Sequence, residues 1–169
     1  QSRSSAASDV YKRQILIMII LEEVEVIQND WSDSLLELAA LHQKNIDISN
    51  QTSDFIDRLY FYDFGDVLFK PTLASQTQFR KTKEGALSYF IGNNNKFPED
   101  SGFALKSWTN IIWENSSIKI IGNIALAMGN YYFINNKGKL KVEFSFVYKK
   151  DENNNLRIIL HDSHLPYKK

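Results

Sequence analysis

The hydrophobic positions in the first third of the chain repeat with a helical period. They fall, with gaps of 4, 3, 4, 4 and 3 residues, at Ile20, Val24, Ile27, Trp31, Leu35 and Leu38. Because such spacing lines one side of a helix, it predicts an amphipathic helix over residues 20–43. Two shorter helices are expected after it, one at residues 54–62 and one at residues 83–91, where Thr82 is a suitable N-cap.

The second half of the chain changes to the period of strands. Polar residues alternate with Leu140, Val142, Phe144, Phe146 and Tyr148, which predicts a strand with one buried and one wet face. Other strands are expected at residues 67–69, around 103–105, and at 107–114, 118–128, 131–134 and 156–162, with turns at 135–138 and 151–155. Helices followed by an antiparallel meander predict an α+β fold with the helices on one face of a curved sheet.

Residues 1–14 follow neither period. They read QSRSSAASDVYKRQ and look like a translated sequencing adapter or a disordered tail. The remainder, residues 18–169, is expected to form a single domain, since typical domains contain ~100–200 residues. The true start is either Met18 or a lost upstream segment, so a signal peptide and the cellular compartment stay open.

The composition narrows the class of function. The chain has 20 basic and 20 acidic residues, which disfavours nucleic acid or an anionic membrane surface as the main partner, because both need a basic patch. No stretch approaches the ~20 apolar residues of a membrane span. The absence of cysteine removes disulfides, thiolate metal sites and cysteine nucleophiles. The signatures of serine hydrolases, phosphate loops, zinc proteases and dinucleotide-binding domains are also missing.

The most unusual segment is the polar run at residues 161–164, at the end of the last expected strand. Because side chains alternate along a strand, His161 and Ser163 share one face, which is the inner one if Leu160 points outward. His161, Asp162 and His164 are zinc-ligand types, but the alternation divides them between two faces. A strand end that becomes polar where it meets water is the plainer alternative.

Seven segments in a fixed order resemble one known family. They are LYFYDFG (59–65), VLFKPT (67–72), QFR (78–80), GALSYF (85–90), GFAL (102–105), ALAMGNY (125–131) and HDSHLPY (161–167). In these segments the chain is similar to the iota class of carbonic anhydrase, which is related to the association domain of calcium/calmodulin-dependent protein kinase II within the nuclear-transport-factor-2-like superfamily. The resemblance runs from about residue 21 to residue 167.

The resemblance implies a cone-shaped fold, with a curved antiparallel sheet wrapped around N-terminal helices, and a homodimer formed through the sheet. It also implies reversible hydration of carbon dioxide to bicarbonate without a metal or other cofactor. The family's three pocket hydroxyls carry over onto Thr72, Tyr89 and Ser163, which are expected to orient a water and stabilise developing charge. The family usually closes with two histidines and two serines, so Asp162 and His164 depart from its pattern.

Four further residues complete the expected site. His161 is expected to accept the proton, since its unperturbed pKa of ~6.5 is near neutral. Phe69 and Phe90 are expected to form the apolar wall against carbon dioxide. Arg80 is a candidate for binding the bicarbonate anion, with a surface ion pair as the alternative.

Two other classes of function remain open, because folds of this kind host many activities. One is a non-catalytic association module or small-ligand-binding protein, which would not require the three hydroxyls. The other is a different small-molecule enzyme, such as an isomerase, which would be expected to place an Asp or Glu deep in the pocket.

Overall fold

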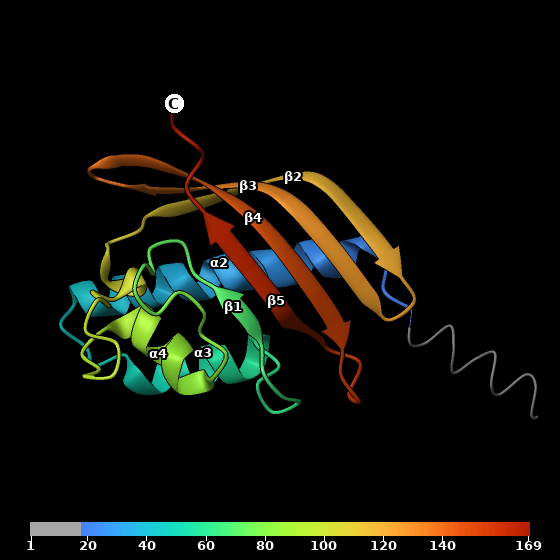
Figure 1. Cartoon of the computed structure of the whole chain (residues 1–169), viewed down its shortest axis with the longest axis horizontal. Coiled ribbons are helices and arrows are strands. Elements are labelled where there is room, and N and C mark those ends of the chain that lie inside the picture. Colours follow the sequence, from blue (N-terminus) through green and yellow to red (C-terminus); the bar gives the residue numbers. More distant parts are fainter. Residues whose placement is uncertain (1–17) are drawn as a thin grey trace, which may run out of the picture.

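The helices pack against one face of a curved sheet (Figure 1). The computed structural model describes residues 18–169, so the tail expected at residues 1–14 lies outside the described residues. In chain order the elements are α2 (Leu21–Gln43), α3 (Ser49–Leu59), β1 (Leu68–Lys70), α4 (Lys83–Ile91), the 3-10 helix η1 (Phe103–Leu105), β2 (Asn110–Ile121), β3 (Ile124–Asn135), β4 (Gly138–Lys150) and β5 (Leu156–His164). The expected α+β class is confirmed.

The sheet has the strand order β1-β5-β4-β3-β2. Strands β2 to β5 form the expected antiparallel meander. The short strand β1 adds to the edge of β5 in parallel, with Phe69 opposite His161 and Lys70 opposite Asp162. This parallel pairing joins an early segment of the chain to its last strand, and the sequence pattern did not predict it.

Several local expectations were wrong. The helix expected over residues 54–62 is α3, which begins at Ser49 and ends at Leu59. Residues 118–128 were expected to be one strand, but the chain reverses within them at Gly122, which adopts a positive φ of 59° between β2 and β3. The turn is the dipeptide Gly122-Asn123 between two isoleucines, which is a two-residue hairpin signal that the sequence analysis passed over. The segment expected as a strand around Phe103 is instead the short helix η1, which buries Phe103 in the core.

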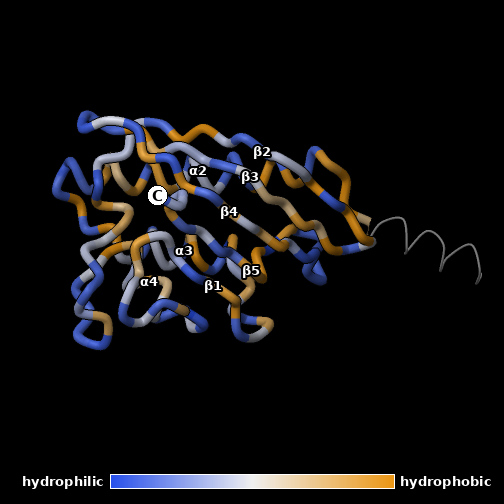
Figure 2. The backbone as a smooth tube through the Cα atoms, turned by 45° about the horizontal axis from the view of Figure 1, so that its top comes forward, coloured by the Kyte–Doolittle hydropathy of each residue, from blue (hydrophilic) through white to orange (hydrophobic). Residues whose placement is uncertain are grey.

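The core lies between the helices and the concave face of the sheet. Hydrophilic and hydrophobic residues are interleaved along the strands (Figure 2), and on β4 the inward residues Phe144, Phe146 and Tyr148 are buried as the alternation predicted. On the opposite face of β3, Leu126 and Met128 are exposed. Among the described residues, no helix combines the length and hydrophobicity that crossing a bilayer requires.

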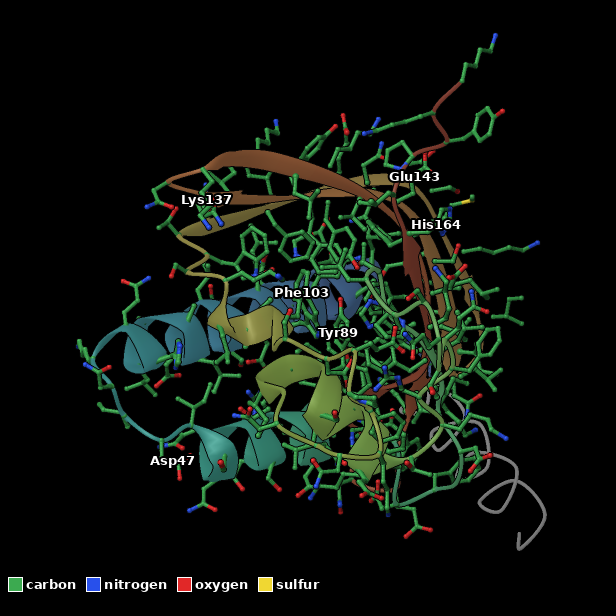
Figure 3. The ribbon with its side chains drawn as sticks, turned by 60° about the vertical axis from the view of Figure 1, so that its left-hand side comes forward. Asp47, Tyr89, Phe103, Lys137, Glu143 and His164 are labelled. Atoms are coloured by element: carbon green, nitrogen blue, oxygen red, sulfur yellow. The ribbon has the colours of Figure 1, made fainter. Side chains whose placement is uncertain are left out.

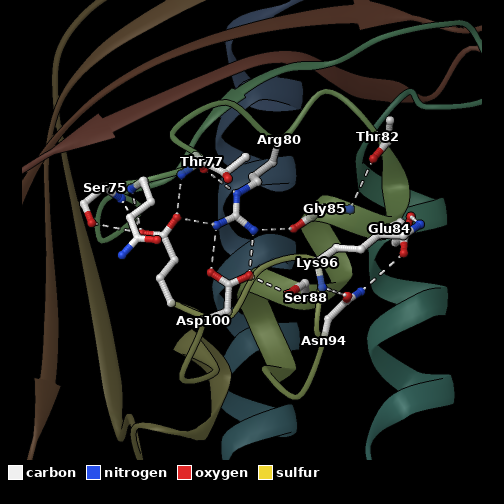
Figure 4. Close-up of polar contacts among 12 residues, drawn as sticks. Ser75, Thr77, Arg80, Thr82, Glu84, Gly85, Ser88, Asn94, Lys96 and Asp100 are labelled. Carbon is white, nitrogen blue, oxygen red and sulfur yellow. Dashed lines mark hydrogen bonds and ion pairs between the residues drawn. The ribbon is translucent and has the colours of Figure 1, made fainter.

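The buried side chain of Arg80 connects the loop before α4 to the loop after it (Figure 4). The Nε–H of Arg80 donates to the Thr77 carbonyl at 2.8 Å, and its Nη groups donate to both carboxylate oxygens of Asp100, at 2.6 and 2.8 Å. The hydroxyl of Ser88 on α4 also donates to Asp100, and the backbone N–H of Arg80 donates to the Phe69 carbonyl on β1 at 2.7 Å. These contacts hold α4 against β1.

Glu99, in the loop that follows α4, belongs to the same cluster. Its carboxylate accepts backbone N–H donors from Ser75, Gln76 and Thr77 and pairs with Arg80 at 3.3 Å. Partial burial would raise the pKa of Glu99, but the backbone donors outweigh it and lower that pKa to about 2. The carboxylate is therefore ionised at neutral pH and completes the charge balance of the buried guanidinium.

We predict that Arg80→Met destabilises the protein far more than Arg58→Met. Removing Arg80 leaves the carboxylates of Glu99 and Asp100 buried without their cationic partner. Such a loss typically lowers the free energy of unfolding by ~3–5 kcal/mol. Arg58 pairs with Asp30 at the surface, with both side chains about half exposed, and such pairs contribute ~0–1 kcal/mol. Urea unfolding of both variants checks this, and equal losses of unfolding free energy would contradict it.

Candidate active site

The alternation of β5 brings two polar side chains into the core. His161 and Ser163 are 2% and 1% exposed, whereas the side chains of Asp162 and His164 are 41% and 47% exposed. His164 lies at the outer side of the sheet, within 3.1 Å of Glu143 (Figure 3). The expected division of residues 161–164 between two faces is confirmed, and it places His161 and Ser163 inside.

Ser163 meets a hydroxyl that is 91 residues away in the sequence. The Oγ1 of Thr72 and the Oγ of Ser163 are 2.9 Å apart and share a hydrogen bond. The parallel pairing of β1 with β5 causes this meeting, because β1 ends at Lys70, opposite Asp162, and Thr72 follows two residues later. Lys70 also connects β1 to β5, because its Nζ donates a hydrogen bond to the Ser163 carbonyl at 3.0 Å. We call Thr72 and Ser163 the hydroxyl pair.

Tyr89 approaches the hydroxyl pair from α4. Its ring stacks on Phe103 at 5.4 Å and meets Phe69 edge-on at 5.8 Å, so it lies between the helices and the sheet (Figure 3). Burial raises the pKa of Tyr89 far above its usual range, although the nearby Leu73 N–H and Thr72 hydroxyl moderate the rise. The buried hydroxyl completes no hydrogen bond within residues 18–169. Such a group normally has a water or a ligand as its partner.

A small cavity opens beside Tyr89. Its volume is about 50 Å³, and its lining residues are Leu73, Tyr89, Glu99, Asp100, Ser101, Gly102, Phe103 and Lys106. A single water needs roughly 10–15 Å³, so the space suits a molecule of a few heavy atoms. Larger hollows exist elsewhere, including a cleft of about 820 Å³ near Arg157 with many charged residues in its lining. The hydroxyl pair lines neither this cleft nor the cavity beside Tyr89, which it approaches from the side of the sheet.

His161 is held between two tyrosines that the sequence analysis missed. Its Nδ1 lies 2.9 Å from the Tyr60 hydroxyl and its Nε2 lies 3.1 Å from the Tyr131 hydroxyl. The rings of Phe69 and Phe146 sandwich the imidazole at 4.7 and 4.0 Å. Burial lowers the pKa of His161 well below 6.5, so the ring is neutral. The sequence could have indicated such a contact, because a tyrosine at an inward strand position, such as Tyr131, needs a hydrogen-bond partner for its buried hydroxyl.

The expected substrate-binding residues divide into two groups. Phe69 lies beside both Tyr89 and His161, and Phe90 stacks on Phe69 at 6.0 Å, so both belong to the aromatic surroundings of the cluster. Arg80 does not reach the hydroxyl pair with a free donor, because protein acceptors occupy all of its N–H groups. It is 1% exposed, so it is neither an anion anchor nor a surface ion pair, and its role is structural.

The residues considered as zinc ligands do not converge. His161 points into the core, and Asp162 and His164 point outward on the other face of β5. Within residues 18–169, no group of three or more His, Cys, Asp or Glu side chains is arranged to hold a metal ion. The donor set of this chain therefore does not fit a zinc centre at the end of β5.

Comparisons with known proteins identify the family of this chain. A sequence model of the family described as metal-independent carbonic anhydrase matches residues 22–165. A metal-independent carbonic anhydrase from Nostoc sp. (strain PCC 7120) is 41% identical over 166 residues, which cover 95% of this chain and 81% of the relative.

The solved structure of a relative gives the same result. The crystal structure of an iota-carbonic anhydrase from a cyanobacterium, complexed with bicarbonate, superposes with a TM-score of 0.87 at 38% identity, covering 90% of this chain and 96% of the other. A nuclear transport factor 2-like protein from Salmonella enterica is more distant, with a TM-score of 0.43, 12% identity and coverage of 86% and 95%. From the match over residues 22–165 and the 41% identity, this chain belongs to the metal-independent carbonic anhydrase family.

Proposed function

We propose that this protein catalyses the reversible hydration of carbon dioxide to bicarbonate in the small cavity beside Tyr89. The observation that carries the proposal is the meeting of the hydroxyl pair at 2.9 Å next to the unpartnered hydroxyl of Tyr89. These are the three hydroxyls that the family resemblance assigns to the pocket. The relative that was crystallised with bicarbonate supports the same reaction.

The aromatic wall suits the uncharged substrate. Carbon dioxide has no net dipole, and the rings of Phe69 and Phe103 that flank Tyr89 offer it a dry surface. A site that excludes water also strengthens the interaction between a hydroxyl donor and a developing negative charge, because the local dielectric constant is low. The same cavity can therefore accept a neutral gas and stabilise an anion.

The three hydroxyls provide the polar part of the reaction. The raised pKa of Tyr89 keeps its hydroxyl protonated, so it donates to an oxygen of carbon dioxide as charge develops there. The hydroxyl pair orients the attacking water, since each hydroxyl both donates and accepts. Fixing the water and the gas in one cavity lowers the entropic cost of their encounter.

Proton removal does not fit the role expected for His161. Burial lowers the pKa of this ring, and both its nitrogens are already bonded to tyrosines, so it is a poor final acceptor. We infer that the proton leaves through the cavity opening to water or buffer. The carboxylate of Asp100, which lines the cavity, is bound by Arg80 and Ser88. It is therefore also a poor candidate for the deep acid that an isomerase would need.

We predict that hydration survives removal of metal. The side chains of residues 18–169 form no cluster suited to a metal ion, and the reaction above uses hydroxyl groups alone. Stopped-flow measurement of carbon dioxide hydration, before and after dialysis against a strong chelator, should give the same kcat. Activity that disappeared with the chelator and returned with zinc or manganese would contradict the proposal.

We predict that Tyr89→Phe lowers kcat by ~10²–10³, the usual loss when one preorganised donor to a developing oxyanion is removed. Ser163→Ala should also lower kcat, because it breaks the hydroxyl pair that orients the attacking water. Both changes leave the ring stacking and the backbone in place. Ser145→Ala is the matched control, because Ser145 pairs in register with Asp162 on the outward face and should retain full activity. A Ser163→Ala enzyme as active as the Ser145→Ala enzyme would remove the hydroxyl pair from the mechanism.

We also propose that the protein is a homodimer that associates through the outer face of its sheet. Exposed apolar side chains on that face include Ile112 and Ile121 on β2 and Leu126 and Met128 on β3. Isolated exposed apolar residues are common, but a group on one sheet face is typical of an interface. The family resemblance implies the same arrangement.

Light scattering at micromolar concentration should give twice the chain mass of 19.6 kDa. Met128→Lys should shift the protein toward the monomer, because a charge would be buried in the interface. Ile46→Lys is the control, since Ile46 is an exposed apolar residue in the connection between α2 and α3. A monomeric wild-type protein, or equal dissociation in both variants, would contradict the proposed dimer.

A further inference from the structure

The small cavity beside Tyr89 has charged groups in its lining as well as aromatic rings. Glu99 and Asp100 contribute carboxylates to it, and Lys106 contributes the one cationic side chain among its lining residues within residues 18–169. Carbon dioxide carries no charge, whereas bicarbonate is an anion. The balance of charge around the cavity therefore affects the two molecules differently.

Without Lys106 this balance is unfavourable for an anion. Backbone donors lower the pKa of Glu99 to about 2, so its carboxylate is ionised at neutral pH. The Arg80 guanidinium pairs with both Glu99 and Asp100, so two carboxylates face a single cation in this cluster. Bicarbonate entering the cavity would be repelled by the excess negative charge, which the ammonium of Lys106 compensates.

The two carboxylates leave Lys106 free for a ligand. Glu99 accepts from three backbone N–H groups of residues 75–77 and from Arg80. Asp100 accepts from Arg80 and from the Ser88 hydroxyl. Across residues 18–169, the side-chain contact of Lys106 involves its backbone carbonyl, and no carboxylate lies within ion-pair distance of its ammonium. Three N–H donors are thus available to an anion in the cavity.

The backbone that carries Lys106 is held firmly. Lys106 directly follows η1, and the ring of Phe103 in η1 stacks on Tyr89 at 5.4 Å. The Lys106 carbonyl accepts from Nδ2 of Asn135 at the end of β3, at 2.9 Å. The Phe103 carbonyl accepts from Nε1 of Trp108 at 2.8 Å. The lysine side chain therefore starts from a fixed point beside the Tyr89 ring.

We propose that Lys106 is the anion-binding residue of the cavity, and that its ammonium donates to bicarbonate together with the unpartnered hydroxyl of Tyr89. This inference rests on the proposed function and deepens it, because it assigns the binding of the charged reactant to one residue. It also gives to Lys106 the role that the sequence analysis considered for Arg80.

A titration with ¹³C-bicarbonate, followed by NMR, measures the binding directly. In Lys106→Met the Kd should rise about 10-fold, because a hydrogen bond from a charged group is lost at a partly exposed position. Lys106→Arg should retain most of the affinity, since it keeps the charge and the donors. Lys44→Met is the control, because it removes the same charge from an exposed position at the end of α2. An unchanged Kd in Lys106→Met, or an equal rise in Lys44→Met, would overturn the inference.

Two further readouts separate charge from packing. The attraction of a partly exposed ammonium is screened by salt. The sodium salt of a bulky sulfonate, too large for a cavity of about 50 Å³, should therefore weaken bicarbonate binding more in the wild type than in Lys106→Met. The KM for carbon dioxide, which is uncharged, should be the same in both enzymes. Equal salt dependence, or a KM for carbon dioxide that rose together with the Kd for bicarbonate, would contradict the assignment.

The outcomes distinguish this inference from the proposed function. A wild-type enzyme that hydrates carbon dioxide, with normal bicarbonate affinity in Lys106→Met, would refute the inference and leave the function standing. Bicarbonate binding that depends on Lys106, in a wild-type protein without hydration activity, would support the anion site and refute the enzyme. If Lys106→Met does not fold, Lys106→Gln decides in its place, because it removes the charge and keeps a polar side chain.

Discussion

The register of β5 between β1 and β4 decides which polar groups enter the core. His161 and Ser163 point inward opposite Phe146 and Phe144 of β4, and the parallel strand β1 sets Phe69 beside His161. A slip by one residue would exchange them for Asp162 and His164, and an unpaired carboxylate among these rings would be far more costly than a hydroxyl. The position of the hydroxyl pair and the contacts of the imidazole follow from this register.

The site combines two demands that usually conflict. A dry aromatic pocket favours carbon dioxide, while bicarbonate and its formation require hydrogen-bond donors. The protein meets both by burying groups that remain neutral, namely tyrosines with raised pKa values and a histidine with a lowered one. The carboxylates of Glu99 and Asp100 line the same cavity, and their charges are paired with the buried Arg80. The Ser88 hydroxyl on α4 also donates to Asp100, so this cluster holds α4 and Tyr89 in place.

Much of this arrangement could be predicted from the sequence, because it depends on local periodicity. The helix at residues 83–91 was predicted from its N-cap Thr82, and the strand β4 and the shared face of His161 and Ser163 were predicted from alternation. The parallel pairing of β1 with β5 and the partners of Arg80 could not be, because they join segments far apart in the chain. The contacts of His161 with Tyr60 and Tyr131 were missed for the same reason, since the three residues come from separate segments that only the fold brings together.

The central claim is that bicarbonate binds at the hydroxyl pair and Tyr89. A crystal structure of this protein grown with bicarbonate, after treatment with a chelator, tests it most directly. The account predicts a planar ligand whose oxygens lie within hydrogen-bonding distance of Thr72, Tyr89 and Ser163, against the ring of Phe69 or Phe103. Bicarbonate bound instead in the charged cleft near Arg157, or on the outer face beside Asp162 and His164, with the Tyr89 cavity filled only by water, would contradict it.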